Sequence, residues 1–211
     1  MADLKGIAEC LIKGQAPKVK EMVQAAVNEG VPAQQILSEG LIAGMNVVGT
    51  KFKANEFYIP EVLIAARAMH AGMAILKPLL AKAGSKAATV FAIGTVKGDL
   101  HDIGKNLVAM MMEGAGYDVV DVGIDAPPEK FIEIIKEKKP AVLGLSALLT
   151  TTMPAMKSTI DAIKAAGLKD SVKVIIGGAP ITQSYADEIG ADGYAADAAS
   201  AVDIAKKLIG K

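Results

Sequence analysis

Apolar side chains recur every three or four positions through the first eighty residues, the spacing that gathers them on one face of a helix. Such stripes run from Val19 to Val27, from Leu37 to Phe52 and from Val62 to Leu76, the last just after Pro60, a residue favoured in the first helical turn. With a short helix expected at about residues 4–13, the pattern predicts a four-helix bundle whose neighbouring helices are antiparallel.

The pattern changes after about residue 88, where short apolar runs alternate with helical segments. Strands are expected at 88–93, 119–122, 141–145, 172–176 and 193–195, and helices at 101–114, 129–138, 153–166, 182–189 and 198–209. This alternation is typical of a doubly wound α/β domain, flavodoxin-like or Rossmann-like, with five parallel strands between helical layers. We therefore expect a helical domain at 1–83, a small polar linker at 84–87 and an α/β domain at 88–211.

Charge and composition narrow the class of protein. Lysines and arginines number 23, as do aspartates and glutamates, so the net charge is zero and neither nucleic acid nor a membrane surface is expected as a partner. No apolar run of bilayer-spanning length is free of charged residues. The single cysteine, Cys10, fits a reducing compartment, and no signal peptide follows Met1, so a cytoplasmic location is expected.

The loop after the first expected strand holds the most distinctive polar motif, Asp99-x-His101-x-x-Gly104. Doubly wound sheets bind ligands beyond the carboxyl ends of their strands, where this loop lies. A carboxylate two residues before a histidine can accept the ring's second N–H, which fixes the tautomer and makes the other nitrogen a better metal ligand. The glycine patterns of nucleoside-triphosphate and dinucleotide sites are absent from the loop. The competing interpretation is a histidine that only hydrogen-bonds Asp99 or Asp102.

Two further motifs, Ser146-Ala147-Leu148 and Gly177-Gly178, follow the third and fourth expected strands. With Asp99-x-His101-x-x-Gly104, they resemble the signature of proteins that bind cobalamin in its base-off form, with a histidine as the lower cobalt ligand. The resemblance implies that His101 takes the place of the cofactor's nucleotide base and that Asp99 hydrogen-bonds His101.

The resemblance also implies a slot for the displaced nucleotide tail, lined by glycines that leave it room. Ser146 and Thr150 would hydrogen-bond the tail, and Thr152, where relatives often have serine, would complete a hydrogen-bonded chain with Asp99. With His101 as the metal ligand, the expected cofactor-binding residues of this domain are Asp99, Leu100, Asp102, Ile103, Gly104, Ser146, Leu148, Thr150, Thr152, Gly177 and Gly178.

Two stretches of the helical half, 47–52 and 57–62, resemble the helical cap of methionine synthase and of corrinoid proteins in methanol, methylamine and methoxyl metabolism. That resemblance implies that Phe52 and Ile59 cover the upper face of the corrin and shield the methyl group on cobalt. The competing interpretation is that both residues are ordinary bundle core.

The resemblance as a whole implies a stand-alone corrinoid protein of a multi-component methyltransferase system in anaerobic one-carbon metabolism. Such a protein is a carrier with no catalytic residues of its own, and its cobalamin alternates between methylcobalamin and Co(I) states. Its implied partners are a substrate-specific methyltransferase, a second methyltransferase with a tetrahydrofolate or thiol acceptor, and a reductive activation protein. Carriers of this shape serve methanol, methylamines, betaines and methoxylated aromatics, so the methyl donor stays open.

Two other classes compete with the carrier. A cobalamin-binding subunit of a radical mutase shares the second half, but the fused helical cap and the lack of a catalytic barrel count against it. A regulator that senses cobalamin would normally add a DNA-binding domain, for which the sequence offers neither a basic excess nor room.

Overall fold

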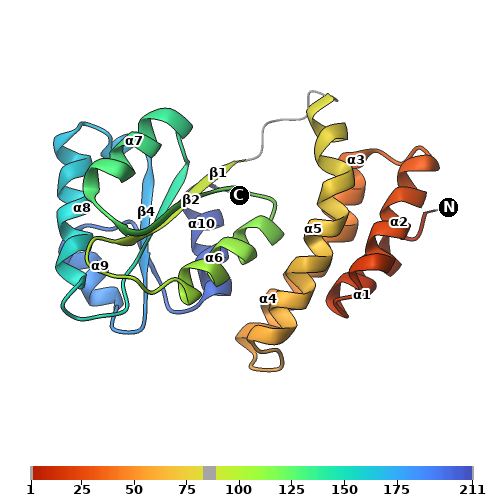
Figure 1. The fold of residues 1–211 in the computed structure, drawn as a ribbon, viewed down its shortest axis with the longest axis horizontal. Coiled ribbons are helices and arrows are strands. Elements are labelled where there is room, and N and C mark those ends of the chain that lie inside the picture. Colours follow the sequence, from red (N-terminus) through yellow and green to blue (C-terminus); the bar gives the residue numbers. More distant parts are fainter. Residues whose placement is uncertain (1, 83–88, 211) are drawn as a thin grey trace. The chain divides into compact units, whose positions relative to one another are not determined.

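The computed structural model describes residues 2–82 and 89–210, and the linker expected at 84–87 lies outside them. The chain divides into two compact units, an N-terminal helical unit and a C-terminal unit that begins at Thr89 (Figure 1). Each unit is described by itself.

The N-terminal unit is a bundle of four helical arms. They are α1 (Leu4–Ile12), α2 (Ala16–Asn28), a continuous arm of α3 (Ala33–Gln35), the π-helix η1 (Ile36–Ile42) and α4 (Ala43–Lys53), and α5 (Ile59–Lys82). The arms bury the predicted stripes, including Val19, Val23, Leu41, Val48 and Met69. Sequence periodicity predicts the third arm as a plain helix, because a stripe of buried residues does not distinguish π from α geometry.

Close approach of α1 to the third arm depends on glycine. A Cβ at Gly44 would lie 3.1 Å from the backbone oxygen of Ala8, and one at Gly40 would lie 3.2 Å from the side chain of Ile7. Both positions therefore favour a residue without a side chain, which lets the two backbones pack at short range.

Among the described residues, one helical stretch, Ile59–Leu80 of α5, is long and apolar enough to cross a membrane by length and composition. It also contains Glu61, Arg67 and Lys77. Within the bundle, α5 packs against α2 and α4. Its buried positions Val62 and Leu76 belong to the bundle core. These contacts are those of a core helix in a helical bundle.

The C-terminal unit is a parallel five-stranded sheet with the strand order β2-β1-β3-β4-β5. The strands are β1 (Val90–Val96), β2 (Asp118–Ala126), β3 (Val142–Ser146), β4 (Lys173–Gly177) and β5 (Gly193–Ala195). The helices between and after them are α6 (Ile103–Gly114), α7 (Pro128–Lys138), α8 (Met153–Ala165), the short 3₁₀ turn η2 (Lys169–Ser171), α9 (Gln183–Ile189) and α10 (Ala198–Leu208). This is the expected doubly wound α/β architecture.

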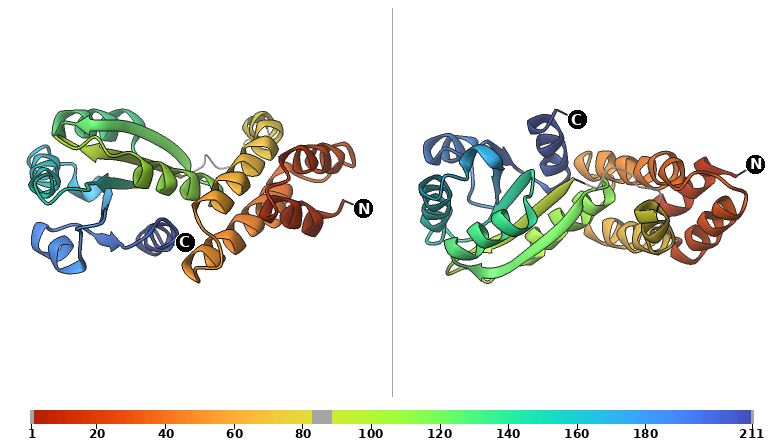
Figure 2. Two further views of the ribbon diagram at one scale, coloured as in Figure 1. Left: turned by 60° about the horizontal axis from the view of Figure 1, so that its bottom comes forward. Right: turned by 90° about the horizontal axis from the view of Figure 1, so that it is seen from above.

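Helices cover both faces of this sheet, with α7, α8 and α9 in one layer and α6 and α10 in the other (Figures 1 and 2). Ala92, Leu143 and Val174 are paired in register across β1, β3 and β4, so their side chains share one face. They belong to one buried cluster with Phe131 of α7 and Ile160 of α8. This face of the sheet is therefore packed against an apolar layer of helices.

Several element boundaries differ from the sequence-based expectation, and three of them lie next to the expected site. The first strand runs on to Val96 instead of ending at residue 93, because Thr95 pairs with Ser146 and Val96 with Ala126. The second extends to Ala126 for the same reason. The helix expected from residue 101 begins at Ile103, so His101 lies in the loop. Strand pairing and loop hydrogen bonds determine where these strands end and where this helix begins, and neither can be recognised in a single sequence.

Candidate functional site

The candidate site lies where the strand order reverses. The chain leaves β1 toward β2 on one side and reaches β3 on the other, so the crevice at the carboxyl ends of β1 and β3 is the switch point of the sheet. The β1–α6 loop, residues 97–102, and the β3–α8 loop, residues 147–152, follow these two strands. Thr95, Ser146 and Gly177 form one row across the ends of β1, β3 and β4. All three sequence motifs therefore meet at this edge.

Asp99 is the buried centre of the site, with its side chain fully enclosed. Its Oδ1 accepts hydrogen bonds from the backbone N of His101 at 3.1 Å and from His101 Nδ1 at 2.7 Å. Its Oδ2 accepts from the backbone N of Leu148 at 2.7 Å and from Thr152 Oγ1 at 2.6 Å. The carboxylate thus joins the β1–α6 loop to the β3–α8 loop.

These hydrogen bonds decide the charge state of Asp99. Burial raises the pKa of a carboxyl group, but the hydrogen bonds from Thr152, Leu148 and His101 outweigh it and hold the pKa of Asp99 well below its usual range. Asp99 is therefore ionised. An ionised carboxylate only accepts hydrogen bonds, so Nδ1 of His101 carries a proton, and in the neutral ring Nε2 is the nitrogen with the lone pair.

His101 is held at the surface in one orientation. Its side chain is 50% exposed, while Asp99 fixes Nδ1. The hydroxyl of Thr95 donates to the backbone oxygen of His101 at 2.9 Å. A ring with a fixed tautomer and a basic nitrogen directed away from its partner has the properties of a single imidazole ligand to a metal.

No group of three or more histidine, cysteine, aspartate or glutamate side chains gathers as a metal site within residues 2–82 and 89–210. A metal held by His101 would therefore need most of its ligands from a non-protein source. A metal inside a macrocycle meets this requirement, because the ring supplies the equatorial ligands and leaves the axial position to the protein.

The glycines of the motifs differ in the space around them. Gly178 has φ +136°, and a Cβ there would lie 1.9 Å from the backbone oxygen of Ala147, so only glycine fits. A Cβ at Gly177 would lie 3.0 Å from the backbone oxygen of Ala195. At Gly104 a Cβ would meet nothing within 4 Å. The first two permit close backbone approach, whereas Gly104 borders open space.

Large apolar side chains are exposed on the two loops that Asp99 joins. Leu100 is 67% and Ile103 is 73% exposed, on either side of His101 in the sequence. Leu148 and Leu149 are each 42% exposed. Exposed apolar groups on loops that a hydrogen-bonded carboxylate joins are typical of a surface that an apolar ligand covers.

The other predicted residues of this unit lie on the same loops. Ser146 is half-buried at the end of β3, and Thr150 is exposed. Asp102 is exposed, and its Oδ2 accepts from Asn106 Nδ2 at 3.1 Å. Their roles toward a cofactor tail stay predictions.

Phe52 and Ile59 lie in the helical unit. Phe52, in α4, is half-buried, and Ile59, the first residue of α5, is 43% exposed. Neither is among the fully enclosed residues of the bundle. Their predicted role above a cofactor stays a prediction.

Sequence reasoning missed several residues that shape the site. The sequence does not single out Thr95, because it lies in a glycine-rich segment, or Leu149, because it lies outside the Ser-x-Leu motif.

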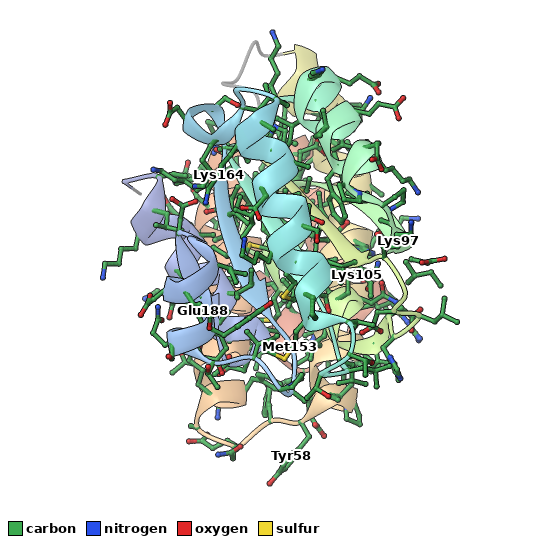
Figure 3. The ribbon with its side chains drawn as sticks, turned by 90° about the vertical axis from the view of Figure 1, so that its left-hand side faces the viewer. Tyr58, Lys97, Lys105, Met153, Lys164 and Glu188 are labelled. Carbon is green, nitrogen blue, oxygen red and sulfur yellow. The ribbon has the colours of Figure 1, made fainter. Side chains whose placement is uncertain are left out.

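Residues of β2 and α6 also support the site. Asp125, at the end of β2, accepts from the backbone N of Gly98 at 2.7 Å. Lys105 is almost fully buried and paired with Asp121. Figure 3 labels Lys97 and Lys105, which bracket the His101 loop in the sequence, and Met153 at the N-terminal end of α8.

Comparison with protein families gives two matches of the same description. Residues 89–203 match a model described as a B12 binding domain, and residues 4–77 match a second model described as a B12 binding domain. The matches cover the α/β unit and the helical unit respectively.

Comparison with characterised proteins finds relatives over nearly the whole chain. A dimethylamine corrinoid protein of Methanosarcina barkeri is 46% identical over 98% of this chain and 97% of its own length. Corrinoid protein DSY3155 of Desulfitobacterium hafniense is 42% identical over 100% of this chain and 99% of its own length.

Solved structures show the same relationship. A cobalamin-binding protein from Desulfitobacterium hafniense has a TM-score of 0.82 and 35% identity, with 99% of each chain covered. A chain of the methanol:cobalamin methyltransferase complex MtaBC from Methanosarcina barkeri has a TM-score of 0.85 and 32% identity, over 97% of this chain and 78% of that one.

Proposed function

Because this chain belongs to the B12-binding family of corrinoid proteins, we propose that His101 is the protein ligand that would hold the cobalt of a bound corrinoid. The protein is a methyl carrier of a corrinoid-dependent methyltransferase system, and its relatives over both units include a dimethylamine corrinoid protein and a chain of a methanol:cobalamin methyltransferase complex. The Asp99–His101 hydrogen bond at the switch point carries the ligand assignment, since it occupies Nδ1 and leaves Nε2 as the basic nitrogen of a half-exposed ring.

The residues present fit a corrinoid. Nε2 of His101 is available for cobalt, the exposed side chains of Leu100 and Ile103 offer apolar contact to a macrocycle, and the open space at Gly104 leaves room for a displaced tail. When bound, the corrinoid supplies a cobalt atom that accepts a methyl group and gives it up again. Ser146, Thr150 and Gly177 are the residues we expect beside the tail.

The protein's own part in the chemistry is to hold the ligand and manage one proton. Asp99 keeps the ring proton of His101 on Nδ1, so Nε2 is free to bind metal. When Nε2 is released, it can take up a proton, and the ionised Asp99 then stabilises the imidazolium through the same 2.7 Å contact. Thr152 and the Leu148 backbone N keep Asp99 ionised throughout.

The partners follow from the carrier role. The related chain from the MtaBC complex is found with a methyltransferase, and we propose that a substrate-specific methyltransferase docks on this protein in the same way. A second methyltransferase, acting on tetrahydrofolate or a thiol, and a reductive activation protein complete the proposed system, which we place in the cytoplasm. The radical-mutase alternative is not favoured, because the matching relatives are corrinoid proteins of methyltransferase systems.

For the methyl donor we propose a methylated amine, with dimethylamine as the first to test. This choice is supported by 46% identity to a dimethylamine corrinoid protein and 44% identity to a trimethylamine corrinoid protein, both of Methanosarcina barkeri.

The test combines binding with methyl transfer. The purified protein is incubated with hydroxocobalamin, freed of unbound corrinoid, and examined by absorbance. We expect about one corrinoid per chain with the spectrum of an imidazole-ligated, base-off form, and retention of no corrinoid would refute the proposal. Methyl transfer is then measured with methyltransferases specific for dimethylamine, trimethylamine and methanol. A response to methanol alone would contradict the donor assignment but leave the carrier intact.

A further inference from the structure

The loop that carries His101 is attached to β2 at both of its ends. At the first end, Asp125 Oδ1 accepts from the backbone N of Gly98 at 2.7 Å, and the backbone N of Asp125 donates to the backbone oxygen of Asp99 at 3.0 Å. Asp125 thus accepts a hydrogen bond from Gly98 and donates one to Asp99, both more than twenty positions away in the sequence. These two hydrogen bonds hold the start of the loop against the end of β2.

The second attachment is an ion pair between a buried lysine and an exposed aspartate. Lys105, in the first turn of α6, is only 2% exposed, and its Nζ lies 2.8 and 2.7 Å from the two carboxylate oxygens of Asp121 in β2. The same Nζ donates to Asn106 Oδ1 at 2.8 Å, and Asp121 Oδ1 also accepts from the backbone N of Gly123. The end of the loop is therefore anchored to β2 as well.

Each attachment uses a residue in a locally unfavourable state, a positive φ at Asp125 and a buried charge at Lys105. Asp125 has φ +48°, in the left-handed region that is uncommon for residues other than glycine and that aspartate and asparagine tolerate better than most side chains. Lys105 places a cation near the N-terminus of α6, where the helix dipole is unfavourable to positive charge, and burial adds a desolvation cost. What the two attachments have in common is that both hold the His101 loop against β2.

We propose that Asp125 and the Lys105–Asp121 pair are positioning residues that hold the His101 loop in its metal-binding geometry before the corrinoid arrives. This inference rests on the proposed function, because it assigns the ligand role to His101. Thr95 and Asp99 fix His101 within the loop, whereas the two attachments to β2 fix the loop relative to the sheet. A ligand held in place in advance binds more tightly, because less disorder is lost on binding.

Two variants of Asp125 separate the side chain from the backbone conformation. Asp125→Gly removes the acceptor for Gly98 but permits positive φ, whereas Asp125→Asn keeps both an acceptor oxygen and tolerance of positive φ. We expect Asp125→Gly to raise the dissociation constant for hydroxocobalamin by roughly three- to tenfold, the effect of one hydrogen bond. We expect Asp125→Asn to restore affinity to within about twofold of the wild type.

Lys105→Met tests the attachment at the end of the His101 loop, because methionine keeps an apolar side chain of similar length and removes the charge that pairs with Asp121. Its matched control is Lys157→Met, which breaks an exposed ion pair with Asp161 on α8. We expect a loss of hydroxocobalamin affinity for Lys105→Met and none for Lys157→Met. If Lys105→Met does not fold, the Asp125 pair alone decides the matter.

A second readout uses the protein without corrinoid. Ring ¹H–¹⁵N NMR signals of His101 report its order, and we expect them to broaden or split in Asp125→Gly but not in Asp125→Asn. A general loss of stability would not single out this ring. Unchanged His101 signals together with unchanged affinity in Asp125→Gly would overturn the proposal, as would equal effects of the glycine and asparagine variants.

Failure of this inference is distinct from failure of the proposed function. If wild-type protein takes up no hydroxocobalamin, the ligand role of His101 and this inference both fail. If the wild type binds but Asp125→Gly and Lys105→Met bind equally well, only the positioning role fails.

Discussion

Thr152 Oγ1 lies 2.6 Å from Asp99 Oδ2, a hydrogen bond between residues 53 positions apart that ties the start of α8 to the His101 loop. Thr152 Oγ1 also lies 2.9 Å from the backbone oxygen of Leu149, but its single proton can serve only one acceptor at a time. A carboxylate is the stronger acceptor, so the proton belongs to Asp99. The hydroxyl at position 152 is thus one of the donors that hold the pKa of Asp99 low and keep it ionised.

The first prediction concerns this hydroxyl. Thr152→Val keeps the shape of the side chain and removes the donor, leaving the buried Asp99 carboxylate one hydrogen bond short. We expect the free energy of unfolding to fall by about 1–3 kcal/mol. Urea denaturation followed by circular dichroism measures it. Thr152→Ser is the control, since it retains the hydroxyl, and a loss in Thr152→Ser as large as in Thr152→Val would contradict the role of the hydrogen bond.

The placement of the site is largely predictable from the sequence. Alternating strands and helices indicate a doubly wound sheet, and such a sheet brings the ends of its central strands to one edge whatever the details of its loops. Thr95, Ser146 and Gly177 indeed form one row there. The topology of the sheet alone therefore predicts that the motif around His101 lies beside the Ser-x-Leu and Gly-Gly motifs.

The supports of the site are not predictable in the same way. Lysine is rarely buried, so nothing in the sequence sets Lys105 apart from an exposed helix residue. Asp125 follows a strand that the apolar pattern ends at residue 122, and its contact with Gly98 lies 27 positions away in the sequence. Both depend on pairing between β1 and β2, a tertiary property that periodicity does not encode.

The second prediction separates two glycines that the motifs treat alike. Gly178→Ala places a Cβ against the backbone oxygen of Ala147 at a positive φ, so we expect a stability loss of about 3 kcal/mol or more. Gly104→Ala meets open space in a helix, and we expect stability to stay equal or rise by up to about 1 kcal/mol. Thermal melting of both variants measures the difference.

Gly104→Ala should weaken corrinoid binding even though it leaves the stability of the fold intact. The added methyl group occupies space that we assign to the nucleotide tail, so we expect Gly104→Ala to bind hydroxocobalamin roughly tenfold more weakly despite its intact fold. Wild-type affinity in this variant would show that the tail does not pass Gly104.

The third prediction addresses the ligand itself. His101→Ala removes the proposed axial nitrogen while Asp99 keeps its bonds from Thr152 and Leu148, so the fold should persist. We expect the dissociation constant for hydroxocobalamin to rise by about tenfold or more and the imidazole-ligated absorbance spectrum to be lost. His70→Ala, which changes the other histidine of the chain, serves as the control. An unchanged spectrum in His101→Ala would refute the ligand assignment.

The fourth prediction tests the exposed apolar side chains beside His101. Leu100 is 67% exposed, so Leu100→Ser removes little buried surface and should change the free energy of unfolding by less than about 0.5 kcal/mol. If a corrin ring covers Leu100, the same change removes apolar contact from the bound state, and we expect hydroxocobalamin affinity to fall by roughly three- to tenfold. Leu100→Met keeps an apolar side chain of similar volume and should bind as the wild type does. Equilibrium titration by absorbance, with urea denaturation of the same samples, separates binding from folding. Equal affinity in Leu100→Ser and Leu100→Met would mean that the ring does not rest on this side of the His101 loop.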